Sequence, residues 1–147
     1  MAAIFGFLRR KASRRTERQK TGQAGERAAE RFLKKHGYRI LARNVTYRQG
    51  EVDLVAREKR TGTICFVEVR SRTLNADTDA VVEPEETITL AKRRRVISAA
   101  LTFLTRRRAA DRPVRFDVIT VRFAGDRRGK ADIRHYPAAF DVTGRLT

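Results

Sequence analysis

The stretch CFVEVRSR, residues 65–72, places a glutamate inside an apolar run. Its first three residues and Val69 are typical of a strand that is buried on both faces. Glu68 interrupts this run, and an ionised carboxylate in such a strand costs several kcal/mol unless another group pairs with it. The sequence therefore predicts a partner for Glu68, either a cationic side chain or a metal ion.

The segments around this strand alternate between helix and strand signals. Thr21 is expected to cap the first helix and Gly37 to end it, while Thr61 and Gly62 form a hairpin turn and residues 73–86 an acidic irregular loop. The predicted elements are, in order, a helix (21–37), three strands (38–45, 50–58 and 63–72), a helix (about 87–108) and two strands (114–123 and 132–140). This order predicts an α/β fold with a mixed central sheet flanked by helices.

The helix expected over about 87–108 has an apolar side and a basic start. Its apolar residues recur at helical spacing, which predicts that they face the core. These residues are Ile97, Ala100, Leu101 and Leu104. Lys92 and the three arginines after it form the basic cluster.

The composition is strongly basic. The 147 residues include 34 Lys and Arg against 17 Asp and Glu, a net charge of +17, and most of the cations are arginines, which suit bidentate contact with phosphate. A polyanion is the expected partner, with nucleic acid before anionic membrane and DNA before RNA, because no RNA-reading motif is evident. A basic composition without a specific partner is the alternative. The residues expected to contact nucleic acid are Arg9, Arg10, Lys11, Arg14, Arg15, Arg93, Arg94 and Arg95.

The chain divides into a tail and one domain. Residues 1–20 carry seven Lys and Arg and one Glu, which predicts a basic, flexible tail, and residues 21–147 are long enough for a single domain. The one cysteine, Cys65, permits no intrachain disulfide and fits a reducing compartment, so a cytoplasmic location is expected. No apolar run reaches the roughly 18 residues of a membrane span.

A second carboxylate is expected beside Glu68. Because strand residues alternate between faces, Asp53 and Glu68 lie on one face if the second and third predicted strands pair as a hairpin, directly opposite or one register apart. Two carboxylates that close repel each other unless a cation lies between them. Mg²⁺ binds through one or two carboxylates together with waters and substrate phosphate. Two interpretations remain open: Glu68 is a metal ligand, or it forms a structural ion pair with Arg70.

The triplet of residues 68–70 resembles the E-x-K of the PD-(D/E)XK nucleases. More closely, the chain resembles the YraN-like family of bacterial predicted endonucleases, which are related to Holliday-junction resolvases. The resemblance extends from about Thr21 to Val121 through GQAGERAAERFLKKHGYRILARNVTYRQGEVDLVA, FVEVRSR, AKRRRVISAALTFL and RFDVITV. It implies a restriction-endonuclease-like αβββαβ core and a metal-dependent endonuclease that hydrolyses phosphodiester bonds in DNA, including branched DNA.

The resemblance also implies a set of site residues. Asp53 and Glu68 match the metal-binding carboxylates, with Mg²⁺ or Mn²⁺ as the cofactor, while Glu26 matches an acid on the first helix and Lys92 a lysine at the start of the second. Arg70 departs from the pattern, because the motif has lysine there. Arginine keeps the charge and grips phosphate, but its pKa is too high for a general base.

Alternatives stay open beside these roles. Glu26 would also stabilise a helix N-terminus, Asp53 would pair with a neighbouring arginine, and Asp117 would pair with Arg115 or border the sheet. The departure at Arg70 leaves a non-cleaving DNA- or RNA-binding module on the same fold as the second hypothesis. A homodimer is also compatible with the resemblance, since a DNA junction has two-fold symmetry.

Overall fold

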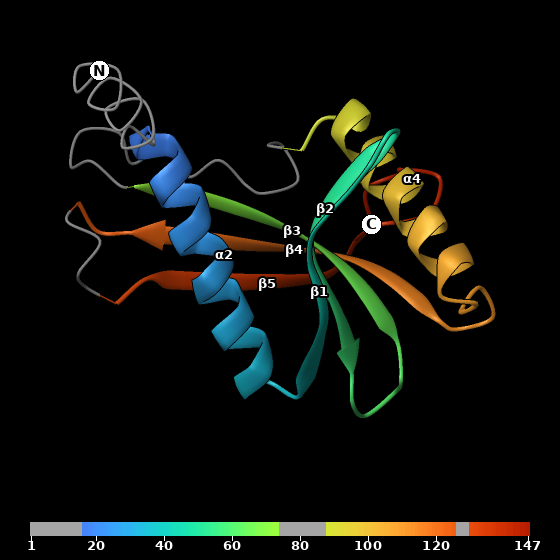
Figure 1. Ribbon diagram of the computed structural model, residues 1–147. Helices are drawn as coiled ribbons and strands as arrows, with labels where there is room; N and C mark the ends of the chain where they lie inside the picture. The colour runs from blue at the N-terminus through green and yellow to red at the C-terminus, as the bar shows by residue number, and fades with distance from the viewer. Residues whose placement is uncertain (1–15, 74–87, 126–129) are drawn as a thin grey trace, which may run out of the picture.

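The computed structural model describes residues 16–73, 88–125 and 130–147. These contain, in chain order, α2 (Glu17–Lys35), β1 (Tyr38–Tyr47), β2 (Gly50–Glu58), β3 (Ile64–Thr73), α4 (Leu90–Arg106), β4 (Val114–Phe123) and β5 (Asp132–Phe140). The strands form one five-stranded sheet in the order β1-β2-β3-β4-β5, with β3 and β4 parallel and the other neighbours antiparallel. This mixed α/β fold is consistent with a restriction-endonuclease-like core, as the sequence predicts (Figure 1).

The two helices pack on opposite faces of the sheet and toward opposite ends of it (Figure 1). On one face, Leu33 of α2 packs in a core cluster with Val67 of β3. On the other face, Val96 and Phe103 of α4 pack with Phe66. Phe66 and Val67 are consecutive and fully buried, so alternation along β3 supplies both cores. Neither described helix is long and apolar enough to cross a membrane.

Helix α2 begins earlier than its sequence predicts. Thr16 is the N-cap of a capping box: its hydroxyl accepts a hydrogen bond from the Gln19 backbone amide, and the Gln19 side chain accepts one from the Thr16 backbone amide. The prediction that Thr21 caps the helix is wrong, because Thr21 lies buried inside it. The helix therefore includes residues 17–20 of the predicted tail, while residues 1–15 lie outside the described part of the chain. At the other end Gly37 has a φ of 87°, as expected of a helix terminator.

The remaining boundaries agree closely with the predictions, with one core residue misplaced. β2, β4 and β5 have the predicted bounds, and nearly all of the predicted acidic loop falls outside the described residues. Leu101 was expected in the core but is 59% exposed. The buried arc of α4 also takes in Val96, Ala99 and Phe103, so its centre lies away from Leu101.

Both edge strands are irregular. β1 carries a bulge where its register shifts between Ile40 and Ala42, and Asn44 has a φ of 47°. The pairing of β4 with β5 shifts between Phe116 and Val118, and Ala138 has a φ of 54°. Bulges of this kind bend a strand and leave residues outside the ladder.

Asp117 holds the β5 irregularity in place. Its carboxylate is fully buried and accepts hydrogen bonds from Arg115 Nε at 2.8 Å and from the Ala138 amide at 3.0 Å, and His135 Nε2 lies 2.8 Å away. Burial favours the protonated acid, but the hydrogen bonds from His135 and Arg115 outweigh it and hold the pKa of Asp117 below its ordinary value. Of the two alternatives for Asp117, the pair with Arg115 is the one observed.

Two glycines of α2 provide a test of how closely the helix approaches β3. A Cβ at Gly25 would lie 1.6 Å from Ser71 Oγ and 2.7 Å from Ser71 Cβ, whereas a Cβ at Gly22 would meet nothing within 4 Å. We expect Gly25→Ala to lower the free energy of unfolding by about 1–3 kcal/mol through overpacking. Gly22→Ala, the matched control, is expected to raise it by about 0.5–1 kcal/mol, since alanine favours the helix. Urea denaturation measures both, and a stabilising Gly25→Ala would contradict this packing.

Candidate active site

Strands β2 and β3 separate where the two carboxylates stand. Their paired register ends at Leu54 opposite Val67, and one further step would set Asp53 opposite Glu68. Beyond this point β2 remains paired with β1 and β3 with β4. The Val69 amide donates to Asp53 Oδ2 at 2.8 Å, so a side chain replaces the ladder hydrogen bond. The split thus creates a place where side chains, not backbone, join the two strands.

Asp53 and Glu68 form a buried like-charge pair at this split. Glu68 is 3% exposed, and the two carboxyl groups lie close enough for each to affect the other's ionisation. Burial, followed by the charge of Asp53, raises the pKa of Glu68 to about 8. Burial also raises the pKa of Asp53, against the hydrogen bond from Val69. The pair therefore favours a shared proton, or a cation that neutralises it.

Two cationic side chains approach Glu68 from one side. Lys92 Nζ lies 3.7 Å and an Arg70 guanidinium nitrogen 3.9 Å from Glu68 Oε1. Neither distance is that of a hydrogen bond. The other oxygen, Oε2, is buried and has no hydrogen-bond partner among the described residues. The structural ion pair between Glu68 and Arg70 therefore leaves half of the carboxylate unsatisfied.

Glu51 belongs to the same cluster, although it was not among the predicted site residues. Its Oε1 lies 2.8 Å from Lys92 Nζ and 3.9 Å from an Arg95 nitrogen. Hydrogen bonding to Lys92 lowers the pKa of Glu51 below its ordinary value. The signal was present in the sequence, since Glu51 and Asp53 are two residues apart on one strand and alternation puts both on the same face.

Gly50 allows α4 to bring Lys92 this close. A Cβ at Gly50 would lie 1.9 Å from the Arg95 carbonyl oxygen and 3.1 Å from the Ala99 amide nitrogen. Any other residue would push the start of β2 away from the backbone of α4. The glycine before Glu51 therefore fixes the distance at which the helix presents its lysine to the strand.

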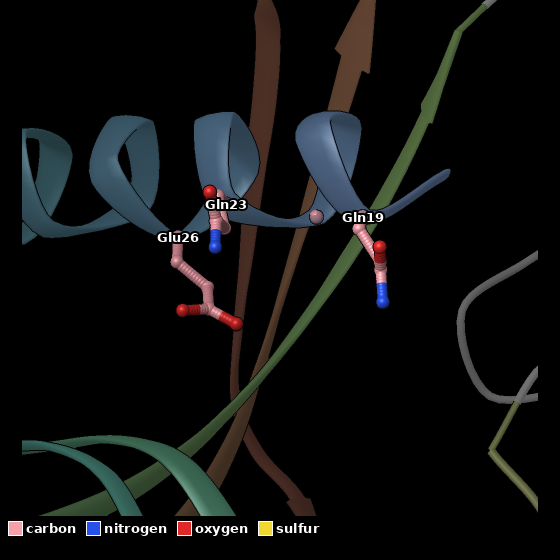
Figure 2. Close-up of a pocket in the computed structure, with 4 residues that line it drawn as sticks. Gln19, Gln23 and Glu26 are labelled. Carbon is pink, nitrogen blue, oxygen red and sulfur yellow. The ribbon is translucent and has the colours of Figure 1, made fainter. Parts of the chain in front are cut away.

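Glu26 approaches the carboxylates from α2. Gln19, Gln23 and Glu26 project from one side of the helix (Figure 2) and, with Gly22, line a shallow polar pocket of about 330 Å³. A second pocket of about 290 Å³ continues from Gln23 and Glu26 to the Arg43–Asn44 region of β1. Burial, and then the charge of Asp53, raises the pKa of Glu26, opposed by a hydrogen bond with Asn44. Glu26 thus lies within electrostatic reach of Asp53.

Asp53 and Glu68 fit a divalent cation that keeps part of its own coordination shell. Among the described residues, no three His, Cys, Asp or Glu side chains converge closely enough to hold a metal alone. Mg²⁺ does not require such a cage, because it usually takes one or two carboxylates and completes its shell with waters and substrate phosphate. A divalent cation would satisfy the buried Glu68 Oε2, which has no hydrogen-bond partner among the described residues, and would neutralise two acids whose pKa values burial raises.

The basic residues predicted to contact nucleic acid are spread over different environments. Arg9, Arg10, Lys11, Arg14 and Arg15 lie outside the described residues. Arg93 is half-buried and donates to the carbonyl oxygens of Ile88 and Gly144, which ties α4 to the C-terminal turn. Arg94 is exposed, and Arg95 is exposed beside Glu51. Their contact with nucleic acid stays a prediction.

The raised pKa of Glu68 makes the stability of the metal-free protein depend on pH. The folded state binds a proton between the ordinary pKa of 4.5 and about 8, so this group's stabilisation falls as pH rises through that window, by on the order of 5 kcal/mol in all. Urea denaturation in a chelator, at about pH 5.5 and about pH 8, should show that the free energy of unfolding of wild type is lower at the higher pH. The decrease should be much smaller in Glu68→Gln. Adding Mg²⁺ at the higher pH should raise the free energy of unfolding of wild type again, but not that of the variant. Equal pH profiles for the two proteins would contradict the buried pair.

The fold and the site together define a mixed α/β protein with a candidate metal-binding pair of carboxylates between two strands. The chain belongs to the Uncharacterised protein family UPF0102, whose model matches residues 25–121. This matched segment contains Glu26, Asp53, Glu68, Arg70 and Lys92.

Relatives from several bacteria are similar over most of their length. A UPF0102 protein of Myxococcus xanthus (strain DK1622) is 44% identical over 126 residues, which are 86% of this chain and 93% of the relative. A UPF0102 protein of Geobacter metallireducens is 40% identical over 121 residues, 82% of this chain and 92% of the relative.

Proposed function

We propose that this protein is a metal-dependent endonuclease of the PD-(D/E)XK type, close to the YraN-like proteins, that hydrolyses phosphodiester bonds in DNA. The observation that carries the proposal is the buried pair of Asp53 and Glu68, in which the buried oxygen Glu68 Oε2 has no hydrogen-bond partner among the described residues. A structural pair would be fully hydrogen-bonded, as Asp117 is in the same sheet.

Asp53 and Glu68 would hold Mg²⁺ or Mn²⁺, which when bound polarises the scissile phosphate and lowers the pKa of a coordinated water. The residues around them supply the rest of the electrostatics. Arg70 is partly exposed and Lys92 is more buried, and both lie within 4 Å of Glu68 Oε1. Together they would provide positive charge beside a phosphate bound at the carboxylates. Glu26 borders a polar pocket, where a carboxylate can orient a water molecule.

DNA is the proposed substrate because the charge of the chain favours a polyanion. The net charge of +17 would attract phosphates at long range, and the arginines suit bidentate contact once the backbone is bound. The only reason to propose branched DNA is the resemblance to resolvase-like proteins. The experiment below therefore compares different forms of DNA.

Arg70 supports a second candidate, a DNA- or RNA-binding module that does not cleave. An arginine in the place of the motif lysine binds phosphate but does not take part in proton transfer. The same surface would then hold a nucleic acid without hydrolysing it.

One experiment separates the two candidates. Linear, flapped, single-stranded and four-way DNA, together with single-stranded RNA, are incubated with wild type in Mg²⁺ or Mn²⁺, beside a chelator control and Glu68→Ala. Cleavage of any DNA that requires both the metal and Glu68 is the expected result. Binding without cleavage by folded wild type, on every substrate and with either metal, would favour the binding module.

A further inference from the structure

Half of one sheet face is not covered by any described helix. α4 packs against the half where β3 and β4 begin, while α2 crosses the other face of the half where they end (Figure 1). Along β4, Val118 belongs to the core under α4, whereas Ile119 and Val121 belong to the core under α2. Thr120 and Arg122 therefore point to the face opposite α2, beyond the residues that α4 buries.

Arginines from three strands lie on this half of the face, which no described helix covers. In the register of β3 with β4, Arg70 lies opposite Thr120 and Arg72 opposite Arg122. In the register of β4 with β5, Thr120 lies opposite Arg134. Neighbouring strands are about 4.8 Å apart and alternate residues along a strand about 6.7 Å apart, so these four arginines occupy the positions next to Thr120 on this face. The first of these arginines, Arg70, is two residues after Glu68, so the arginines adjoin the candidate active site.

The charge of this surface is only partly balanced. Arg134 lies 3.5 Å from Asp132, an exposed pair of small energetic value. Asp132 also lies opposite Arg122 in the register of β4 with β5, but among the described residues neither Arg72 nor Arg122 has a carboxylate within ion-pair distance. Arginines in adjacent registers repel each other, and the cost is recovered when an anion binds between them.

Thr120 provides a second observation at the same place. Its side chain is 8% exposed, and its Oγ1 is buried without a hydrogen-bond partner among the described residues. A buried hydroxyl without a partner costs about 1–3 kcal/mol, so such a group in the middle of an arginine cluster needs an explanation. A hydroxyl that can donate, with Arg70 and Arg134 opposite it on the two neighbouring strands, is suited to a phosphate oxygen.

We infer that Thr120, Arg72, Arg122 and Arg134 form a phosphate-binding surface that carries the DNA backbone along this sheet face into the active site. The inference rests on the proposed nucleic-acid substrate but not on cleavage. None of these four residues was among the expected nucleic-acid contacts, which lie in the N-terminal segment and on α4. Arg70 lies between this surface and Glu68, where it would pass the backbone to the carboxylates.

The test compares two double variants that remove equal charge. Arg72→Ala with Arg122→Ala removes two arginines of the surface, and Arg31→Ala with Arg39→Ala removes two exposed arginines of α2 and β1. Binding of labelled duplex and single-stranded DNA is measured in a chelator over a range of salt concentrations, with folding checked by circular dichroism and thermal unfolding. Each lost phosphate contact should flatten the log–log salt slope by about 0.9 for duplex and about 0.7 for single strands.

In the double variant Arg72→Ala with Arg122→Ala, we expect the salt slope to flatten by the amount of about two phosphate contacts and the affinity to fall at least about tenfold. The control double variant should bind within about twofold of wild type. Thr120→Val, which keeps the shape of the side chain, should lose about fivefold in affinity without losing slope. Equal losses in the two double variants, or none in the surface variant, would overturn the inference. The single- and double-stranded arms show which backbone the surface accepts.

Failure of this inference can be told apart from failure of the proposed function. If wild type never cleaves but the surface variant loses binding and the control does not, the phosphate-binding surface is supported and the protein is a binding module. If wild type cleaves in a metal-dependent way and the surface variant binds as the control does, the phosphate-binding surface is refuted and the endonuclease proposal is supported.

Discussion

Glu68→Gln is expected to reduce DNA cleavage by about a thousandfold or more, and Asp53→Asn to do the same. Each amide keeps the shape of the side chain but loses the negative charge that would hold a divalent cation. Because both residues would serve one cation, the double variant should be scarcely slower than either single variant. Single-turnover cleavage of the preferred DNA, with excess enzyme and a titration of Mg²⁺, measures all three.

The control for this experiment is Asp111→Asn, which removes the same charge from an exposed position outside the cluster and should cleave as wild type does. Calorimetry should show Mn²⁺ or Mg²⁺ binding that either active-site amide weakens. The amide variants should fold, since removing one carboxylate relieves the repulsion between them. Undiminished cleavage in folded Glu68→Gln would refute the metal-site hypothesis.

Arg70→Ala is expected to lower cleavage by about a hundredfold to a thousandfold while leaving metal binding largely intact. Its guanidinium lies 3.9 Å from Glu68 Oε1 and is partly exposed, so it can reach a bound phosphate but would not ligate a metal. Arg70→Lys should keep cleavage within about tenfold of wild type, because the ammonium retains the charge but not the bidentate grip. Single-turnover rates and metal titrations on the two variants separate charge from coordination.

Lys92→Ala distinguishes a further case in the same series. Lys92 contacts Glu51 at 2.8 Å and lies 3.7 Å from Glu68, so it can replace the motif lysine from the helix side. If Arg70→Ala cleaves normally and Lys92→Ala does not, the helix lysine has taken over the role assigned to Arg70. If Arg70→Lys is as inactive as Arg70→Ala, charge alone is insufficient and the planar guanidinium is required.

Local patterns predicted most of the fold. The strand bounds of β2, β4 and β5 follow from apolar alternation and turn residues, which are encoded within ten or so residues. Thr21 was a wrong choice of cap because Thr16, with Gln19 three residues later, offers a reciprocal capping box. Leu101 was misplaced because helical spacing alone does not show where the centre of the buried arc of α4 lies.

The candidate site was predictable where its residues share a hairpin and unpredictable where they do not. Asp53 and Glu68 are joined by one turn, so alternation places them on the same face. Beyond Leu54 and Val67, β2 stays paired with β1, and β3 stays paired with β4. This separation depends on contacts between segments that are distant in the sequence, and a local pattern does not encode such contacts. The arginine surface depends on the parallel register of β3 with β4, a pairing of segments about fifty residues apart.

The bulges in the two edge strands bear on how this protein behaves at high concentration. An open sheet has two unpaired edges, and a regular edge is a template for a strand of another molecule. Here β1 is interrupted at Ile40 and Ala42, and β5 carries Pro137 and Ala138 opposite Asp117. Neither edge offers a long regular ladder for a second copy. Self-association by continuing the sheet, the common route to fibrous aggregates, is therefore disfavoured.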